Sequence, residues 1–337
     1  MLVGRANERR AIDALVAGAR VGQSGVLVLA GQPGIGKTAL LEYAESIARD
    51  ALVLRATGSE SEREVPFGGL AQLLRPLVPG LGRIPPPQAH ALGIALALQE
   101  GTAADRFTVG AATLSLLTMF SEDRPLGLIL DDGHWLDRPS AEAIVFAARR
   151  LLADSIFVIG AVRSDEPTPL TADLPVLSLD GLDLAGTEEL LRDTIDGADT
   201  RDLPGRLHRV TGGNPLAILA LARDPARLRS LPPDSPAPVP SDVGRLFAGQ
   251  ADELDHDAHL AVLLAAASGG DLATVSRACV ALGVDVAALA RAEEAGLVHV
   301  DAGRIEFAHP LIRSSVYTAA SPSEQRSLHA CLAEAVP

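Results

Sequence analysis

The GQPGIGKT stretch at 31–38 constrains the fold more than any other part of the sequence. It matches the pattern G-x-x-x-x-G-K-[ST], in which glycines let the backbone fold closely around an anion and the lysine reaches the phosphates. An apolar run typical of a buried strand, 25–30, precedes it, and 37–49 has the apolar spacing of a helix. This order predicts a phosphate-binding loop in which backbone amides and a helix N-terminus face the anion.

Lys37 is the only lysine of the chain, although lysine and arginine together number 29. A planar guanidinium is too bulky to enter a tight loop of backbone amides. A compact ammonium on a flexible stem can enter it as a point charge. The retained lysine therefore favours the phosphate-binding interpretation over a chance glycine-rich turn.

Composition bounds the class of protein. The 337 residues are enough for two or three domains, and the net charge is −14. Apolar runs such as 91–98 are too short to span a bilayer and the N-terminus lacks the apolar segment of a signal peptide, so we expect a cytoplasmic protein without membrane contact. Cys279 and Cys331 are expected to be buried and reduced. Residues 241–337 carry 6 arginines against 13 acidic residues, which makes this segment a poor binder of nucleic-acid backbones.

Strands and helices alternate in the first half of the chain. Apolar runs predict strands at 26–30, 51–56, 126–131, 155–162 and 175–179. Because helical patterns separate them, we expect an α/β fold with the doubly wound parallel sheet of a P-loop NTPase, followed by a helical domain and a winged-helix domain. The expected boundaries are 1–182 for the P-loop domain, 183–223 for the helical lid, 224–242 for a proline-rich linker and 243–337 for the winged helix.

The winged-helix expectation comes from the order of elements at the C-terminal end. Helical patterns occur near 243–253, 257–267, 271–282 and 285–295. A short hairpin pattern follows, with strands at 296–300 and 304–307 around a turn at Asp301-Ala302-Gly303, and then a further helix.

Two acidic residues end the third predicted strand. Asp131 and Asp132 are therefore placed at the carboxyl edge of the sheet, beside the phosphate loop. The two carboxylates can then have different roles. Asp131 is expected to hold Mg²⁺ together with Thr38, and Asp132 to orient or deprotonate the attacking water. Arg163 ends the next strand and is expected to sense the γ-phosphate, in preference to being a solvated surface arginine.

Three further motifs are less specific. His134 and Trp135 follow the acidic pair, and a packing role for the tryptophan is preferred to any catalytic role for His134. The GGNPL stretch at 212–216 is, by itself, a helix stop followed by a proline start. His309 opens a helix, and sequence physics alone favours a capping or core residue over a ligand contact.

Taken together, these motifs resemble one family. The sequence is similar to the STAND branch of P-loop ATPases, and within it to the ATP-binding module of large LuxR-type transcriptional regulators of bacteria. The resemblance covers essentially the whole chain and is carried by VGR at 3–5 with Glu8, GQPGIGKT at 31–38, PFGGLAQLLRPL at 66–77, LILDDGHWLDRPS at 128–140, AVRSDE at 161–166, TGGNPLAIL at 211–219 and FAHPLIRSSVY at 307–317.

The resemblance implies a nucleotide-operated switch that binds ATP or ADP with Mg²⁺ and turns over slowly. It places Val3 to Arg5 near the adenine, Pro215 in the base pocket and His309 at the β-phosphate, which reverses the capping interpretation of His309. The nucleotide-binding residues expected on these grounds are Val3, Gly4, Arg5, Gly31, Gln32, Pro33, Gly34, Ile35, Gly36, Lys37, Thr38, Ala39, Pro215 and His309.

The sequence departs from the family at its end. Family members continue into helical repeats that bind partners and into a DNA-binding helix-turn-helix, whereas this chain stops at Pro337. We therefore expect either a truncated regulator or an output domain supplied by another chain. DNA would be contacted only through a domain absent here. We also expect a protein partner or inducer, and nucleotide-dependent oligomers. The alternatives are a P-loop enzyme, such as a small-molecule kinase or stand-alone hydrolase whose insert 64–121 binds the substrate, a scaffold that holds ADP permanently, and the ATPase module of a nucleotide cyclase regulator.

Overall fold

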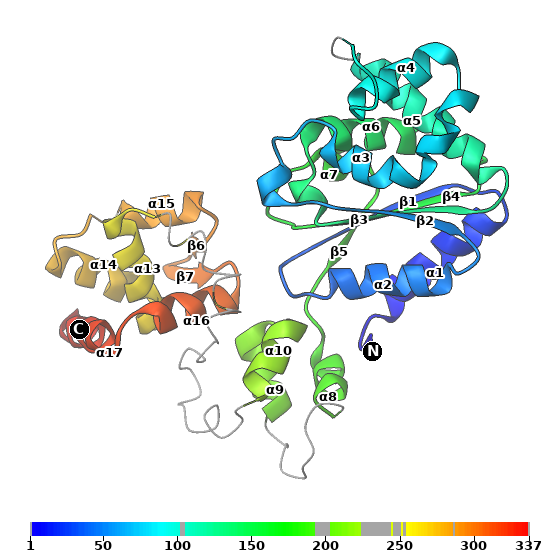
Figure 1. Cartoon of the computed structure of the whole chain (residues 1–337). Coiled ribbons are helices and arrows are strands. Elements are labelled where there is room, and N and C mark those ends of the chain that lie inside the picture. Colours follow the sequence, from blue (N-terminus) through cyan, green and yellow to red (C-terminus); the bar gives the residue numbers. More distant parts are fainter. Residues whose placement is uncertain are drawn as a thin grey trace. The chain divides into compact units, whose positions relative to one another are not determined.

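The chain divides into two compact units, Met1–Asp180 and Gly181–Pro337 (Figure 1). The computed structural model describes residues 2–101, 105–192, 203–223, 244, 251, 254–285 and 287–335. The predicted proline-rich linker at 224–242 and most of the predicted helix at 243–253 lie outside the described residues.

The first unit contains a five-stranded sheet in the order β2-β3-β4-β1-β5, and every neighbouring pair of strands is parallel. The strands are β1 (Gly25–Gly31), β2 (Leu52–Thr57), β3 (Leu126–Asp131), β4 (Ile156–Val162) and β5 (Val176–Leu179). This confirms the predicted parallel sheet. In this order β4 lies between β1, which leads into the glycine-rich loop, and β3, which ends at the acidic pair.

Helices cover both faces of the sheet (Figure 1). One face carries α1 (Ala6–Arg20) and α2 (Lys37–Ile47). The other carries α3 (Gly68–Leu74), the 3-10 helix η2 (Arg75–Arg83), α4 (Pro86–Ala95), α5 (Arg106–Ser121), α6 (Arg138–Ala148) and α7 (Pro169–Asp173).

The strands read as nearly continuous apolar runs because both of their faces are buried. In β4, Phe157 and Ile159 pack into the core under α1 and α2, whereas Ile156 and Val158 belong to the core on the opposite face. All residues of β3 and β4 are buried. Because successive side chains of a strand point to opposite faces, each central strand packs into both cores. This packing on both faces holds the carboxyl edge of the sheet in place.

The second unit is mainly helical. It contains α8 (Leu184–Arg192), α9 (Leu203–Thr211), α10 (Pro215–Ala222), α13 (His256–Ser268), α14 (Leu272–Ala281) and α15 (Ala288–Glu294). An antiparallel hairpin of β6 (Val298–Asp301) and β7 (Arg304–Phe307) follows, and then α16 (Pro310–Ala319) and α17 (Pro322–Ala335). The order of helices and hairpin agrees with the predicted order, and the assignment of this region as a winged helix stays a prediction.

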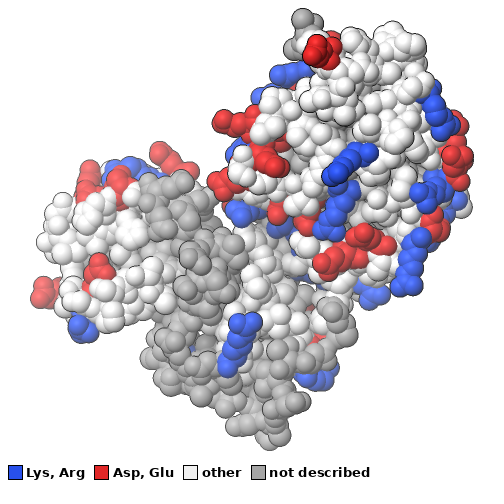
Figure 2. All heavy atoms as spheres, viewed as in Figure 1, with Lys and Arg blue, Asp and Glu red and all other residues white. Residues whose placement is uncertain are grey.

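Figure 2 shows acidic and basic side chains side by side on the visible face of the first unit. Within the described part of the chain, every helix is too short or too polar to cross a membrane.

Candidate functional site

The glycine-rich loop connects β1 directly to α2, as predicted. Gly36 precedes the first helical residue and has φ +103°, a left-handed conformation that residues with a Cβ rarely adopt. A Cβ added there would meet no atom within 4 Å, so the backbone conformation, and not crowding, requires glycine. The loop consequently keeps an open side at the helix N-terminus, the place where an anion is expected.

Lys37 lies inside this loop. Its side chain is 8% exposed, and Nζ donates hydrogen bonds to the carbonyl oxygens of Gly31 (2.7 Å) and Gln32 (2.9 Å). Burial lowers the pKa of the Lys37 ammonium to about 8, and the neighbouring Asp132 carboxylate opposes this shift. The ammonium is thus held by backbone carbonyls at the mouth of the loop.

Thr38 and Asp131 meet across the edge of the sheet. The Thr38 hydroxyl at the start of α2 donates to Oδ1 of Asp131 at the end of β3 over 3.4 Å. Thr38 is exposed and Asp131 is buried. A hydroxyl and a carboxylate are hard oxygen donors, so this pair fits the ligand chemistry of Mg²⁺. The two predicted metal ligands are therefore brought together.

Sequence reasoning missed a cation at this pair. Nη2 of Arg55, from β2, donates to Oδ2 of Asp131 over 3.0 Å, and its Nη1 lies 3.3 Å from Oε2 of Glu45 on α2. Arg55 is the only charged residue of β2. A lone charged residue in a predicted strand is a signal that marks Arg55 as unusual, but it does not give its partner, which depends on the pairing of β2 with β3.

Asp132 occupies the turn after β3 in a left-handed conformation, with φ +46°. Burial raises the pKa of its carboxyl and the Asp131 charge adds to the rise, while Lys37 and Arg163 oppose it. A carboxylate with a raised pKa at the edge of a loop of this kind is suited to accept a proton or to orient water.

Arg163 directly follows β4 and is half-buried. Its guanidinium lies 3.6 Å from Glu166 and 5.9 Å from the centroid of the Trp135 ring. After burial, the positive charge of Arg163 also lowers the pKa of Lys37, so the two cations are close enough to repel each other. This agrees with the predicted position of Arg163 at the edge of the sheet that holds the phosphate loop.

His134 is almost completely buried. It lies in the one-turn 3-10 helix η3 (Gly133–Trp135), its side chain is 4% exposed, and its ring centroid is 5.1 Å from that of Trp135. Neither ring nitrogen has a hydrogen-bond partner among the described residues. Burial, followed by the charges of Arg163 and Lys37, lowers the pKa of the imidazole to about 4.

The N-terminal segment is tied to the loop through Arg5. This buried guanidinium donates to Glu8 (2.8 Å) and to the carbonyl oxygen of Ile35 (3.0 Å). Val3 is buried and Gly4 has φ +64°. The segment predicted to lie near the adenine therefore reaches the phosphate loop.

The remaining loop residues have different environments. Ile35 packs into the core under α1 and α2, whereas Gln32, Pro33, Gly34 and Ala39 are half-buried. The Oε1 atom of Gln32 is buried without a hydrogen-bond partner among the described residues.

The other two predicted nucleotide contacts belong to the second unit. Pro215 is the first residue of α10 and follows Asn214, whose side chain caps the helix. His309 is buried, and its Nδ1 accepts a hydrogen bond from the backbone N–H of Leu311 (3.1 Å), which caps α16. Burial lowers the pKa of His309 to about 4. The capping role that sequence physics alone favours for this histidine is thus present, and its contact with a β-phosphate stays a prediction.

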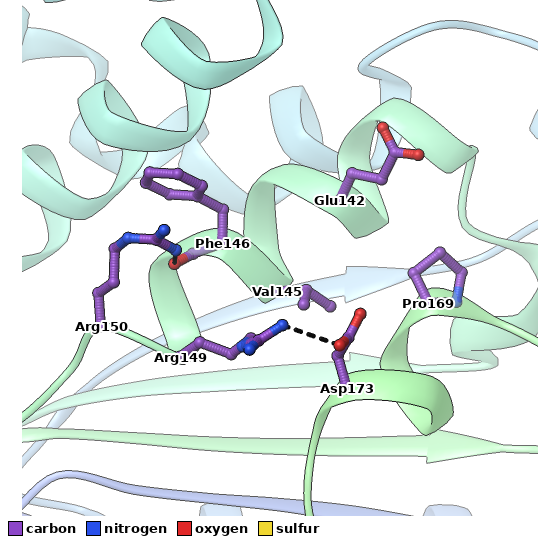
Figure 3. Close-up of a pocket in the computed structure, with 7 residues that line it drawn as sticks. All are labelled: Glu142, Val145, Phe146, Arg149, Arg150, Pro169 and Asp173. Atoms are coloured by element: carbon purple, nitrogen blue, oxygen red, sulfur yellow. Dashed lines mark hydrogen bonds and ion pairs between the residues drawn. The ribbon is translucent and has the colours of Figure 1, made fainter.

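A separate hollow of about 520 Å³ lies between α6 and α7. Figure 3 shows Arg149 paired with Asp173 (2.8 Å) and the Arg150 side chain beside the Phe146 ring, with 3.6 Å from the guanidinium carbon to the ring centroid. Its lining residues are Glu142, Val145, Phe146, Arg149, Arg150, Pro169 and Asp173. None of them belongs to the predicted nucleotide site, so the hollow does not enlarge that site.

Comparison with known proteins decides the class of the first unit. Residues 1–159 match the family described as the AAA ATPase domain. The chain carries a P-loop ATPase module. This match includes the phosphate loop and the acidic pair and ends before Arg163. P-loop ATPases generally use a nucleotide and Mg²⁺, which agrees with the oxygen donors of this module.

Solved structures align with most of this chain at low sequence identity. A Walker-type ATPase of Pyrococcus abyssi has 13% sequence identity and a TM-score of 0.57, with 94% of this chain and 96% of that chain covered. A STAND protein of Pyrococcus horikoshii with a tetratricopeptide repeat sensor has 16% identity and a TM-score of 0.44, with 97% of this chain and 44% of that chain covered. A RuvB mutant of Thermotoga maritima has 14% identity and a TM-score of 0.41, with 97% of this chain and 96% of that chain covered. The first of these supports the fold, and no curated protein matches in sequence.

Proposed function

We propose that the chain is a nucleotide-operated regulatory switch, the ATP-binding and slowly hydrolysing core of a LuxR-type regulator of the STAND class. One observation carries the proposal. The Thr38 hydroxyl and the Asp131 carboxylate meet at 3.4 Å beside a buried Lys37 in a glycine-rich loop. This arrangement supplies a point charge for phosphates and oxygen donors for a divalent cation within one edge of the sheet.

Each residue of the module has a proposed role. Lys37 and the backbone amides of 34–38 bind the β- and γ-phosphates. Thr38 and Asp131 hold Mg²⁺, which supplies neutralisation of phosphate charge when bound. Asp132 orients the attacking water and takes its proton, a role for which its raised pKa is suited.

Arg163 is proposed to sense the γ-phosphate from the end of β4. Its ion pair with Glu166 is loose, with 3.6 Å between the two side chains, so the guanidinium can turn to an anion with little loss. The family resemblance adds the contacts of Val3, Gly4 and Arg5 with the adenine.

The resemblance also assigns Pro215 to the base pocket and His309 to the β-phosphate, where it would retain ADP. The His309 assignment is tested by the rate of ADP release. Release should be faster in His309→Ala than in the wild type, and equal release rates would refute the assignment.

A switch is preferred to a small-molecule kinase because of the insert between β2 and β3. Leu70 and Leu73 of α3 and Leu116 of α5 are completely buried in the core over the sheet. The insert therefore has a covering role, whereas a kinase would need it to bind an acceptor. We accordingly propose a cytoplasmic regulator that acts through a protein partner or inducer, forms nucleotide-dependent oligomers and contacts DNA only through a domain outside this chain.

The proposal is tested by calorimetric titration with ADP and ATP in Mg²⁺ and by single-turnover hydrolysis. Lys37→Ala should abolish binding of both nucleotides without unfolding the protein. Asp132→Asn should bind ATP but hydrolyse it at least about a hundredfold more slowly, because the water loses its orienting carboxylate. Arg149→Ala, which removes an exposed ion pair outside the site, is the matched control and should behave as the wild type.

Two results would contradict the proposal. Wild-type nucleotide affinity in Lys37→Ala removes the site. Equal hydrolysis in Asp132→Asn and the wild type, with ADP that cannot be exchanged, favours a scaffold that holds nucleotide permanently.

A further inference from the structure

His134 lies at the carboxyl edge of the sheet that carries the site. Its turn, η3, begins directly after Asp132 at the end of β3. A Cβ added at Gly133 would come within 2.7 Å of the Leu170 side chain and 3.2 Å of the Val162 side chain, so η3 packs closely against α7 and the end of β4. The turn therefore lies next to the acidic pair and against β4, the strand that pairs with β1 and so neighbours the phosphate loop.

The imidazole is held there without hydrogen bonds. Its side chain is 4% exposed, and neither Nδ1 nor Nε2 has a partner among the described residues. A buried polar group that lacks a partner destabilises a fold, because its hydrogen bonds with water are lost and not replaced. A phenyl ring would fill much of the same space without this penalty, so a histidine here indicates a hydrogen bond made in another state of the protein.

The surroundings of the ring favour an anionic partner. The charges of three cations reach the imidazole, those of Arg163, Lys37 and Arg63, and Asp165 supplies the opposing charge. Burial, and after it the charges of these cations, lower the pKa of the ring and keep it neutral, with one N–H donor and one acceptor nitrogen. A neutral N–H donor in the electrostatic field of three cations is suited to bind a phosphate oxygen.

We propose that His134 donates a hydrogen bond to the terminal phosphate of a bound nucleoside triphosphate and thereby contributes to the preference of the site for triphosphate over diphosphate. The inference rests on the proposed function, because it concerns the same nucleotide site. The ring is covered in the present structure, so the contact requires a local shift of η3 or of the arginine side chains beside Trp135. His134 therefore links arrival of the third phosphate to a rearrangement at the end of β4.

The test compares His134→Phe, His134→Gln and the wild type in the full chain. The dissociation constants of ADP and of a non-hydrolysable triphosphate analogue are measured by calorimetry with Mg²⁺, together with the melting temperature without nucleotide. His134→Phe should weaken analogue binding about tenfold or more, which is the loss of one hydrogen bond to a charged group, and change ADP binding less than about threefold. Its melting temperature without nucleotide should equal or exceed that of the wild type.

A side chain at position 134 that keeps a hydrogen-bond donor and an acceptor should keep the preference for triphosphate over diphosphate. His134→Gln is expected to keep most of the wild-type ratio of the two dissociation constants. His299→Gln, which changes an exposed histidine of β6, is the matched control and should leave both constants unchanged.

A structural role predicts the opposite pattern. A lower melting temperature in His134→Phe, with an unchanged ratio of the two constants, would overturn the inference. Should that variant not fold, the side-chain nitrogen resonances of the wild type decide. The histidine signal that is missing from the His134→Gln spectrum should shift with the analogue but not with ADP, and no shift overturns the inference.

The outcomes also separate this inference from the proposed function. A wild type that binds neither nucleotide refutes the proposed function. A wild type that binds both, with the same ratio in His134→Phe, refutes only the role of His134.

Discussion

Arg55 and Asp131 form an ion pair across neighbouring strands, with 3.0 Å between Nη2 and Oδ2. The carboxylate that is proposed to hold Mg²⁺ therefore already has a cation on one of its oxygens, while Thr38 approaches the other at 3.4 Å. Arg55 is 36% exposed, so the pair adds little to stability. Its main effect is on the electrostatics of the metal site.

Arg55→Ala should lower the Mg²⁺ concentration that nucleotide binding requires. In this variant the guanidinium no longer repels the divalent cation or competes with it for Asp131. We expect the Mg²⁺ concentration that gives half of the maximal ADP affinity to fall about threefold, which corresponds to less than about 1 kcal/mol. Calorimetric ADP titrations at a series of Mg²⁺ concentrations measure it, with Arg149→Ala as control. A raised Mg²⁺ requirement would contradict the competition.

Gly36→Ala should damage the phosphate loop without crowding it. At φ +103° an alanine is strained by about 1–3 kcal/mol, although its Cβ would meet no atom within 4 Å. The loop relieves this strain by changing its conformation, so ADP affinity should fall about tenfold or more. Gly205→Ala in α9 is the control, because its Cβ is also unobstructed and φ is not positive. Equal ADP affinity in Gly36→Ala and the wild type would show that the loop conformation is not needed.

His309 should make α16 less stable in acid. Its pKa is lowered to about 4 from an ordinary value of 6.5, so between these values the unfolded state binds more protons than the folded state. The free energy of unfolding therefore falls as the pH decreases from 6.5 towards 4, by up to about 1.4 kcal/mol per pH unit. Amide hydrogen exchange of α16, corrected for intrinsic rates, measures this loss. His309→Gln should remove most of it, and an unchanged pH dependence in that variant would assign the effect to other groups.

Gly213→Ala should destabilise the packing of helices α8 to α10. Gly213 has φ +75°, and an added Cβ would lie 2.1 Å from the Leu182 carbonyl oxygen. The backbone N–H of Leu182 donates to the Gly213 carbonyl over 2.8 Å, so the chain crosses itself closely here. Both the overlap and the positive φ act against alanine, and we expect a loss of about 2–4 kcal/mol. Faster hydrogen exchange in α8 and α10 would report it, whereas protection equal to that of the wild type would contradict the close crossing.

Much of the ATPase module is predictable from the sequence because its signals are local. Five apolar runs mark the strands. The motif from Gly31 to Thr38, placed between a strand and a helix, is typical of a phosphate-binding loop. The carboxyl edge of a parallel sheet then brings Asp131 and Asp132 to the loop whatever the side-chain packing is. Local pattern and topology were enough for these residues.

Other features depend on contacts between distant segments. Arg55 reaches Asp131 only because β2 pairs with β3, a fact that no spacing in the sequence gives. The missing partners of His134 are a property of the packed edge, and a lone histidine beside a tryptophan is usually a packing residue. In the second unit, Ala217 of α10 joins the core formed by α13 to α17, whereas Ile218 and Leu221 of the same helix belong to a separate core with α8 and α9. This sharing of one helix between two cores is not visible in the sequence, and the predicted boundaries within the unit stay a prediction.

Trp135 gives the native protein a built-in optical probe. It is the only tryptophan among 337 residues, and the guanidinium carbons of Arg63 and Arg163 lie 5.4 and 5.9 Å from its ring centroid. Indole emission responds to nearby charge, so a turn of either arginine towards an incoming phosphate would change the fluorescence. The unlabelled chain can therefore be followed in a stopped-flow instrument, with a signal that arises from this corner of the molecule alone.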